Sequence, residues 1–336
     1  MKAFVAAIES ALPDALLDNE QLSSEYEGWS PDKIYEKTGI RTRRIAAPDQ
    51  CASDLAVCAA QALMRRAPLD PSSVDFLLYC TQTPDYILPT TACVLQHRLG
   101  LPTSCGALDF NLGCSGYVYG LGLAKALIDS GQARTVLLIT ADTYSKLVNP
   151  ADKSVRTLFG DAAAATLVVA SERETLIGPF VYGTDGAGAE NLMVPAGGMR
   201  QPAVAHAELI ADDSGNARTV NDLFMNGAEV FNFTLRMVPK AVEQLLAKAN
   251  VEREAVDLFV FHQANRFMLD HLRRKLRIPE SKFVIAMEDV GNTVSCSIPL
   301  ALQHALERGQ LASGALVMIV GFGVGYSWGA TLMRWA

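Results

Sequence analysis

The sequence predicts an α/β protein made of two similar halves. Two short apolar runs, 74–79 and 256–261, both begin with Val-Asp and continue with four apolar residues. Neither run alternates with polar residues, which is typical of a strand buried on both faces. Each run follows a stretch with helical periodicity, at 56–66 and at 238–249. A helix and a strand that recur in the same order indicate an internal duplication.

A second pair of matching segments lies further along each half. Ser-Gly-Gln at 130–132 precedes a predicted strand at 135–140, and Arg-Gly-Gln at 308–310 precedes another at 315–320. In both places a glycine ends a predicted helix and a strand follows. The two correspondences together predict a duplicated α/β unit.

The boundary between the halves is predicted close to residue 171. A predicted strand at 164–169 is followed by the polar run Ser-Glu-Arg-Glu at 171–174. We therefore predict an N-terminal half of 1–171 and a C-terminal half of 172–336. A chain of 336 residues is long enough for one large domain or for two fused halves.

Composition narrows the possible partners and cofactors. The chain is 50% hydrophobic and 19% charged, so it can bury a sizeable core. Its net charge of −7 argues against general nucleic-acid binding. Seven cysteines without a Cys-x-x-Cys pair indicate neither a disulfide framework nor a metal site. The first residues do not resemble a signal peptide, and no apolar run is long enough to span a membrane. We expect a cytoplasmic protein that uses no metal.

The strongest candidate for a catalytic residue is Cys114. It lies in Asn-Leu-Gly-Cys-Ser-Gly at 111–116, directly before a predicted apolar helix at 117–128. A helix N-terminus presents free N–H groups and a positive dipole end, which favour thiolate over thiol. The flanking Gly113 and Gly116 let another group approach closely. These features predict a nucleophile for an acyl group, whereas the alternative is a small buried hydrophobic residue.

The duplication pairs Cys114 with residues of the C-terminal half. When the halves are aligned on their Gly-Gln pairs, Cys114 falls opposite Asn292, which precedes a predicted helix at 294–306. When they are aligned on their Val-Asp strands, Cys80 falls opposite His262. We therefore expect Cys114 and Asn292 to begin equivalent helices that face each other. His262 should project from the C-terminal end of a strand, where open α/β sheets place their chemistry.

His262 and Asn292 each have a structural interpretation as well, because His262 could cap a turn and Asn292 could cap a helix. Together with Cys114 they can supply a nucleophile, a proton-handling imidazole and an oxyanion donor. Gly-Phe-Gly-Val-Gly at 321–325 is followed by a predicted strand at 328–334, which excludes a dinucleotide-binding loop. We expect the N–H groups of this segment to approach a thioester carbonyl.

These motifs resemble the β-ketoacyl-acyl-carrier-protein synthase III family of the thiolase superfamily along nearly the whole chain. The matching motifs are Thr-Gly-Ile-Arg at 38–41, Ile-Ala-Ala-Pro at 45–48, Phe-Gly-Asp at 159–161, His-Gln-Ala-Asn at 262–265, Gly-Asn-Thr at 291–293 and Trp-Gly at 328–329. A Cys–His–Asn set distinguishes this family from elongating synthases with Cys–His–His and from thiolases with a second cysteine. Type III polyketide synthases share the set but are usually longer. The resemblance implies a five-layered αβαβα fold, a homodimer, and no cofactor beyond the thioester substrates.

The resemblance also implies a condensation reaction of fatty acid biosynthesis. Cys114 would take an acyl group from acyl-CoA or acyl-carrier protein, and the N–H groups of Cys114 and Val324 would hold its oxyanion. His262 and Asn292 would bind the thioester oxygen of malonyl-acyl-carrier protein as CO2 leaves. The product would be a 3-oxoacyl-acyl-carrier protein.

Several positions depart from the family pattern and concern substrate binding. Leu88 stands where the family limits the acyl pocket across the dimer, and Leu in place of an aromatic residue suggests a longer or branched acyl group. Lys33 and Lys153 stand where the family has a Trp and an Arg that hold CoA, and Lys lacks a flat stacking face. We therefore expect weak CoA binding, or a carrier protein that delivers the first acyl group. Phe267 replaces a family Arg, with Arg266 beside it.

A basic run follows His262 in this acidic protein. It is predicted to dock an acidic carrier protein or a phosphopantetheine phosphate, whereas the alternative is a solvated helix face. The residues concerned are Arg266, Arg273, Arg274, Lys275 and Arg277, with Arg41, Arg43 and Arg44 as possible additions.

Three other functions are considered. The same fold could move the acyl group from Cys114 to an alcohol or amine of a specialised metabolite, a reaction that releases no CO2. A cysteine hydrolase of unrelated fold is disfavoured by the duplication and by the lack of a carboxylate near His262 in the sequence. A non-catalytic interaction subunit would usually have lost the nucleophile, whereas Cys114, His262 and Asn292 are all present.

Overall fold

The computed structural model describes residues 2–172 and 177–335, which form two main β-sheets. The first has the order β1-β7-β6-β4-β5. Its strands are β1 (Lys2–Ala11), β4 (Phe76–Cys80), β5 (Gly106–Phe110), β6 (Thr135–Asp142) and β7 (Ala162–Ser171). The second has the order β13-β14-β15-β8. Its strands are β8 (Ile177–Thr184), β13 (Leu258–Phe261), β14 (Leu316–Gly323) and β15 (Ser327–Arg334).

The two sheets repeat one pattern of strand order and direction. In the first, β4 runs parallel to β6, which is antiparallel to β7, which is antiparallel to β1. In the second, β13 is parallel to β14, followed by antiparallel β15 and β8. The predicted strand pair 74–79 and 256–261 corresponds to β4 and β13, so the predicted duplication is confirmed. The predicted boundary at 171 leads into residues 173–176, which lie outside the described residues.

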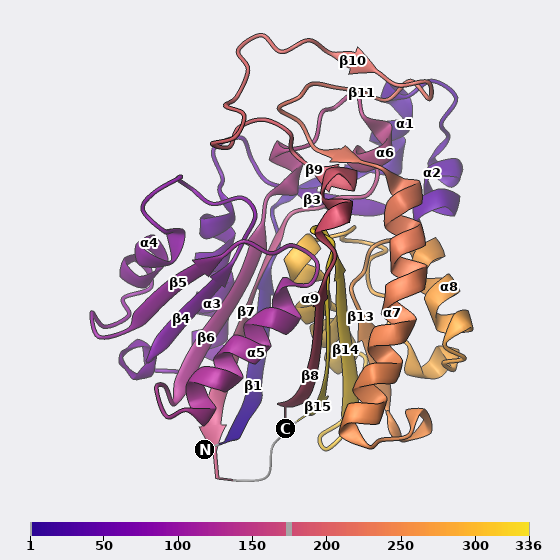
Figure 1. Ribbon diagram of the computed structural model, residues 1–336. Coiled ribbons are helices and arrows are strands. Elements are labelled where there is room, and N and C mark those ends of the chain that lie inside the picture. The colour runs from indigo at the N-terminus through magenta and orange to yellow at the C-terminus, as the bar shows by residue number, and fades with distance from the viewer. Residues whose placement is uncertain (1, 173–176, 336) are drawn as a thin grey trace.

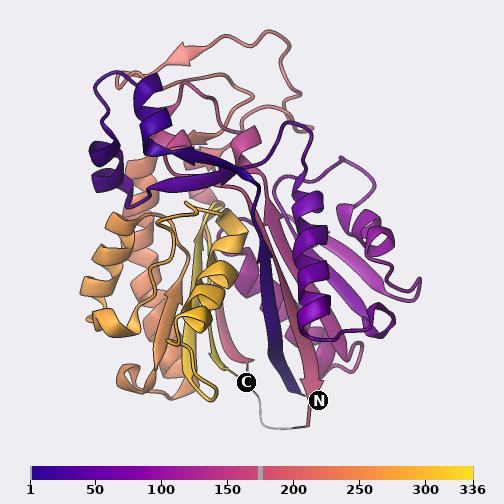
Figure 2. The ribbon, with the colours of Figure 1, turned by 180° about the vertical axis from the view of Figure 1, so that it is seen from behind.

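Helices cover and separate the sheets to give five layers (Figures 1 and 2). The outer layer of the first sheet contains α3 (Ala52–Arg66) and α4 (Thr91–Arg98), and that of the second contains α7 (Gly227–Ala249) and α8 (Arg266–Lys275). Between the sheets lie α5 (Gly116–Asp129) and α9 (Ser297–Glu307). Because α5 contacts both sheets, its apolar side chains are buried on opposite sides, which explains its apolar sequence.

Helix α7 begins eleven residues before the helix predicted at 238–249. Pro239 lies in its interior, although proline is favoured in the first turn of a helix. Pro239 has no N–H to donate to the Leu235 carbonyl, and the Lys275 Nζ of α8 donates to that carbonyl instead, at 2.7 Å. This tertiary contact satisfies the acceptor that the proline leaves open.

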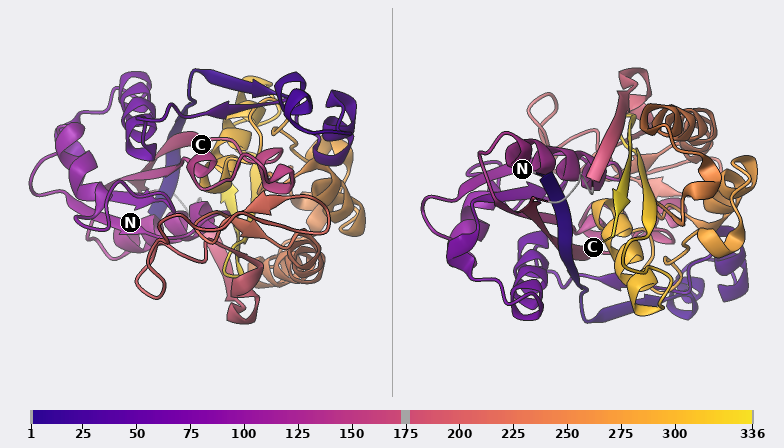
Figure 3. Two further views of the ribbon diagram at one scale, coloured as in Figure 1. Left: turned by 90° about the horizontal axis from the view of Figure 1, so that it is seen from above. Right: turned by 90° about the horizontal axis from the view of Figure 1, so that it is seen from below.

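Shorter elements lie over one end of the two sheets, as the view from above shows (Figure 3). They include the hairpin of β2 (Ala15–Asp18) and β3 (Thr42–Ile45), the helices α1 (Asn19–Glu25), α2 (Pro31–Thr38) and α6 (Lys153–Arg156), and the strand pairs β9 (Leu192–Met193) with β12 (Phe224–Met225) and β10 (Ile210–Ala211) with β11 (Ala217–Arg218). Among the described residues, no helix has the length and apolar character needed to cross a membrane.

Candidate active site

Cys114, His262 and Asn292 line a single cavity of about 70 Å³. Cys114 lies two residues before the start of α5, His262 directly follows β13, and Asn292 lies two residues before the 3-10 turn η6 (Val294–Cys296). All three side chains are almost fully buried. The fold thus brings together three residues that the sequence separates by up to 178 positions.

The backbone of Cys114 lies against the end of β14. A Cβ atom added to Gly323 would lie 2.9 Å from the Cys114 Sγ, and one added to Gly321 would lie 2.8 Å from the Cys114 carbonyl oxygen. These glycines therefore permit the close approach of β14 to the nucleophile. The N–H groups of Cys114 and Val324 are both directed at the Sγ atom. The first three residues of the segment 321–325 complete β14.

The environment of Cys114 does not favour the thiolate in the free protein. Burial, followed by the nearby Asp142 carboxylate, raises the pKa of the Cys114 thiol to about 12. The two N–H groups lower this pKa but do not offset the loss of hydration. The sequence predicted a site that favours the thiolate. In the free protein burial opposes this, because it raises the pKa of the thiol by more than the two N–H groups lower it.

His262 is held by Ser297 and is uncharged. Its Nδ1 lies 2.7 Å from the Ser297 Oγ, and the Gln263 N–H donates to the same oxygen at 3.4 Å. The direction of the Nδ1–Oγ bond depends on the ring tautomer. In the tautomer where Nδ1 accepts from the Ser297 hydroxyl, the ring proton is on Nε2. Burial lowers the pKa of His262 to about 3, so the ring is uncharged. Sequence analysis missed Ser297, because a residue 35 positions away gives no local signal.

Asn292 is fixed through both its backbone and its side chain. Its N–H donates to the Leu158 carbonyl at 2.8 Å, and its carbonyl accepts from the Gly160 N–H at 3.0 Å. Its side-chain Oδ1 accepts from the Val294 N–H at 3.0 Å, which leaves the Nδ2 group to donate toward the cavity. Asn292 does not begin a helix as expected: α9 starts only at Ser297. The reason is Val294, whose φ of 53° interrupts the helical geometry.

The four substrate-binding residues suggested by the resemblance do not line this cavity. Leu88 is 79% exposed on the surface of the chain. Arg41 pairs with Glu288 at 2.5 Å. The Lys153 Nζ donates to the Ser214 carbonyl at 2.7 Å, and the Arg266 Nε lies 3.7 Å from an Asp270 carboxylate oxygen.

The predicted basic surface is smaller than the sequence suggested. Arg43 is fully buried and donates to the Asn19 side chain at 2.9 Å, so it cannot contribute to a surface. Arg273 is 20% exposed and lies between Asp270 and Glu280. On α8 and just after it, Arg274, Lys275 and Arg277 are exposed. Successive residues of a helix point in different directions, so only part of the basic run faces solvent.

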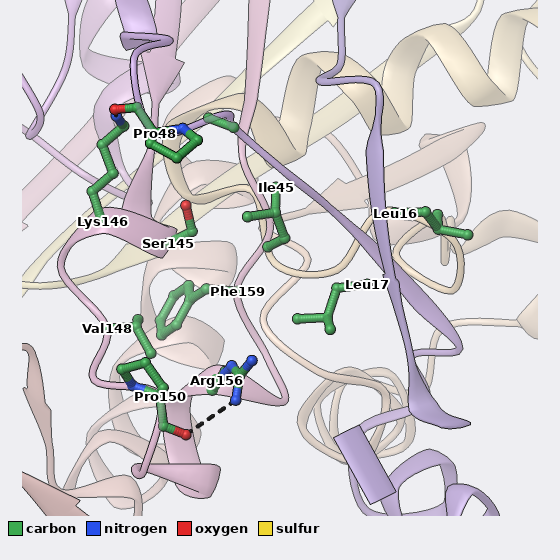
Figure 4. Close-up of a pocket in the computed structure, with 11 residues that line it drawn as sticks. Leu16, Leu17, Ile45, Pro48, Ser145, Lys146, Val148, Pro150, Arg156 and Phe159 are labelled. Atoms are coloured by element: carbon green, nitrogen blue, oxygen red, sulfur yellow. Dashed lines mark hydrogen bonds between the residues drawn. The ribbon is translucent and has the colours of Figure 1, made fainter. Parts of the chain in front are cut away.

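A second, larger cavity of about 420 Å³ shares Phe159 with the site (Figure 4). Its labelled lining includes Leu16, Ile45, Lys146 and Arg156, and the Arg156 guanidinium donates to the Pro150 carbonyl at 3.2 Å. None of the predicted site residues lines it, so the smaller cavity is the candidate for catalysis. Within the described part of the chain, no group of three or more His, Cys, Asp or Glu could hold a metal ion.

Comparison with known proteins gives consistent results. A family model described as 3-oxoacyl-[acyl-carrier-protein (ACP)] synthase III matches residues 108–186, and the model of its C terminal matches residues 246–335. The chain is 35% identical over 327 residues to a β-ketoacyl-[acyl-carrier-protein] synthase III of Caldanaerobacter subterraneus subsp. tengcongensis, covering 97% of this chain and 96% of the relative.

Solved structures show the same relationship. A crystal structure of a 3-oxoacyl-(acyl-carrier-protein) synthase III is 56% identical, with a TM-score of 0.98 and full coverage of both chains. A 3-oxoacyl-(acyl-carrier protein) synthase from Burkholderia xenovorans LB400 is 38% identical, with a TM-score of 0.92, and the match covers 100% of this chain and 95% of that one. The chain therefore belongs to the β-ketoacyl-acyl-carrier-protein synthase III family of acyl-transferring condensing enzymes, with the thiolase-like, five-layered αβαβα fold of two pseudo-equivalent halves.

Proposed function

We propose that the protein condenses an acyl primer with malonyl-acyl-carrier protein through an acyl-Cys114 intermediate. The observation that carries this proposal is the single cavity lined by Cys114, His262 and Asn292. Two sets of donors face it: the N–H groups of Cys114 and Val324 near Sγ, and the side-chain donors of His262 and Asn292. The relatives named above are synthases of this type, which supports the same reaction class here.

The first step is transfer of the acyl group to Cys114. The Sγ atom attacks the thioester carbonyl of acyl-CoA or acyl-carrier protein, and the N–H groups of Cys114 and Val324 hold the oxyanion that forms. The bond from carbonyl carbon to the donor sulfur then breaks. The thiol proton of Cys114 ends on the released thiol, so the step needs no external base.

The second step uses malonyl-acyl-carrier protein. Its carboxylate leaves as CO2, and the electron pair moves onto the thioester, where Nε2–H of His262 and Nδ2–H of Asn292 hold the enolate oxygen. A neutral imidazole suits this role, because it donates without a proton transfer. The carbanion then attacks the acyl-Cys114 carbonyl, the Cys114 sulfur leaves and takes up a proton, and a 3-oxoacyl-acyl-carrier protein is released.

We also propose a homodimer in which Leu88 reaches the cavity of the partner. Tyr86, Ile87 and Leu88 form an exposed apolar stretch, and Leu108 is exposed on β5, the edge strand of the first sheet. Exposed apolar side chains beside an open strand edge favour association. Leu88→Phe should shorten the preferred acyl chain, measured as acylation rate against chain length. A monomer in light scattering, or an unchanged chain preference, would contradict this proposal.

The carrier protein is proposed to dock on the exposed part of α8. Arg274 and Lys275 are exposed there, and Asn265 and Met268 at the start of the helix line the cavity. Arg274→Glu should raise KM for malonyl-acyl-carrier protein and leave KM for malonyl-CoA unchanged, because acidic partners are steered by basic side chains. Lys248→Glu serves as the control, because it makes the same charge change in the last turn of a different helix, α7. Equal effects of the two variants would refute docking on α8.

The test of the function is intact-protein mass after incubation with acyl-CoA and acyl-carrier-protein thioesters of graded chain length. A mass gain that is absent in Cys114→Ala would identify the acyl-enzyme, and the best donor would identify the primer and its carrier. Release of CO2 from malonyl-acyl-carrier protein separates condensation from acyl transfer to an alcohol or amine. If no donor gave an adduct, the acyl-Cys114 reaction would be excluded for the substrates tested.

A further inference from the structure

Asp142 is a buried carboxylate that has no part in the reaction steps above. It ends β6 and is fully buried. Its Oδ1 accepts from the Gln82 N–H at 2.8 Å. Its Oδ2 accepts from the Ser295 N–H at 3.3 Å and from the Ser295 hydroxyl. The donors therefore come from a segment after β4 and from the turn that follows Asn292.

The carboxylate has no cationic partner among the described residues, since no Lys, Arg or His forms an ion pair with it. Burial raises the pKa of Asp142 to about 7 in spite of its hydrogen bonds. A buried carboxylate without a cationic partner is unfavourable unless its oxygens accept hydrogen bonds. The role of Asp142 that this arrangement indicates is to hold Gln82 and Ser295, which donate to it, in place.

The Ser295 bonds restrain a strained turn next to Asn292. Val294 lies between the two residues, is fully buried and has a φ of 53°. A β-branched residue is unfavourable in this left-handed region and persists only where the surrounding structure fixes it. Backbone bonds to Leu158 and Gly160 fix the Asn292 side of the turn, and Asp142 fixes the Ser295 side. In this conformation the Val294 N–H reaches the Asn292 Oδ1.

We propose that Asp142 is a positioning residue that, through Ser295 and Val294, holds the Asn292 amide with Nδ2 toward the cavity. The inference rests on the proposed function, in which Asn292 acts on the malonyl thioester. It assigns Asp142 no contact with substrate. Loss of the restraint should therefore affect the step that uses Asn292 more than the transfer of the acyl group to Cys114.

An Asn in place of Asp142 would weaken one side of this arrangement selectively. The carboxylate has two acceptor oxygens, whereas a carboxamide has one acceptor and one donor. The Gln82 N–H cannot accept a hydrogen bond, but the Ser295 hydroxyl can rotate to accept one. The carboxamide oxygen should therefore face Gln82 and its NH2 group should face Ser295. The Ser295 N–H then loses its acceptor, and the turn next to Asn292 is released.

The experiment compares two half-reactions in the full-length Asp142→Asn enzyme. Acyl-Cys114 formation is followed by intact mass in a single turnover, and malonyl-acyl-carrier protein decarboxylation by CO2 release. Loss of a whole oxyanion donor costs about 10²–10³ in rate, so a misdirected donor should slow CO2 release by about tenfold or more. Acylation should not be slowed by more than about threefold, because its oxyanion donors are backbone N–H groups of other residues and removal of the Asp142 charge lowers the pKa of the Cys114 thiol.

Asp109→Asn is the matched control. The Asp109 carboxylate lies on β5 and accepts from the Thr91 and Ala92 N–H groups, both at 2.6 Å, without a link to Asn292. This variant should leave the ratio of the two half-reactions unchanged. Equal slowing of both half-reactions by Asp142→Asn, or no slowing of either, would overturn the positioning role and identify Asp142 as merely structural.

Ser295→Ala keeps the test decisive if Asp142→Asn does not fold. It removes the hydroxyl bond to Asp142 but retains the N–H bond, so we expect a smaller, selective slowing of CO2 release by a few-fold. An unchanged ratio in Ser295→Ala would then overturn the inference. A wild-type enzyme that forms acyl-Cys114 but releases no CO2 would instead overturn the proposed function itself, together with this inference.

Discussion

The two halves of the molecule share a strand arrangement but supply different chemistry. The first half provides Cys114, which directly precedes Ser115, the N-cap of α5, and packs against the glycines of β14. The second half provides His262 at the end of β13 and Asn292 before α9. One duplicated framework therefore places a nucleophile on one side of a cavity and two polar donors on the other.

The difference between the halves lies in how each helix begins. Helix α5 starts two residues after Cys114, whereas α9 starts five residues after Asn292 and is preceded by a 3-10 turn. The extra turn contains Val294 with its left-handed backbone. A thiol is placed by a simple helix start, but a directed side-chain amide requires an additional restrained turn. The ends of the equivalent strands β4 and β13 differ as well. The residue of the first half that is equivalent to His262 is Cys80, and its Sγ donates to the Leu112 carbonyl at 3.0 Å.

Removal of the nucleophile is expected to have the largest effect. Cys114→Ala should abolish the acyl adduct and the condensation product, because no other group in the proposed mechanism accepts the acyl chain. It should leave CO2 release from malonyl-acyl-carrier protein measurable, since the donors of the second half are intact. Mass spectrometry and a CO2 assay on the same preparation check both points. Loss of both activities would show that the halves do not act separately.

When the donors of the second half are removed, we expect CO2 release to be strongly slowed and acylation of Cys114 to remain. His262→Ala and Asn292→Ala should each slow CO2 release by about 10²–10³, the cost of one oxyanion donor. Acyl-Cys114 should still form, because its oxyanion donors are backbone N–H groups. Single-turnover acylation and CO2 release, measured side by side, check this prediction. Variants that fail equally in both steps would contradict the division of roles.

The contact between the halves can be tested at Gly321. A Cβ atom there would lie 2.8 Å from the Cys114 carbonyl oxygen and from the Ser115 Cα, both of which are backbone. Gly321→Ala should therefore lower the free energy of unfolding by about 1–3 kcal/mol through overpacking. Gly186→Ala, where nothing lies within 4 Å of an added Cβ, is the control and should change stability little. Urea unfolding of both variants gives the comparison.

The smallest predicted effect concerns the pH dependence of stability. In the unfolded chain His262 takes up a proton near pH 6.5, whereas in the folded protein burial lowers its pKa to about 3. Between these values the unfolded state binds more protons, so stability falls as the pH is lowered, by about 1.4 kcal/mol per unit. His262→Asn lacks this contribution. Urea unfolding at pH 6, 5.5 and 5 should give a steeper fall for the wild type, and parallel curves would exclude the buried neutral ring.

Much of the framework could be predicted from local patterns. The apolar runs at 74–79 and 256–261 became β4 and β13, and the predicted helix at 117–128 became α5. Pairing the repeats also predicted that Cys114, His262 and Asn292 belong together, and the structure places them around one cavity. The start of α7 was missed, because only Lys275 of another helix explains why the chain continues through Pro239.

The sequence by itself determined the duplicated α/β order, the positions of the buried strands β4 and β13 and of the helix α5, and the three residue types that meet at the cavity. These depend on periodicity and on short motifs, which are local properties. The tertiary structure alone decided the protonation of Cys114 and His262, because burial raises the pKa of the thiol and lowers that of the ring. It also decided two hydrogen bonds beside the cavity: Ser297 bonds to His262, and Asp142 accepts from Ser295 in the turn after Asn292. Hydration and hydrogen bonds between distant segments exist only once the two halves are packed together.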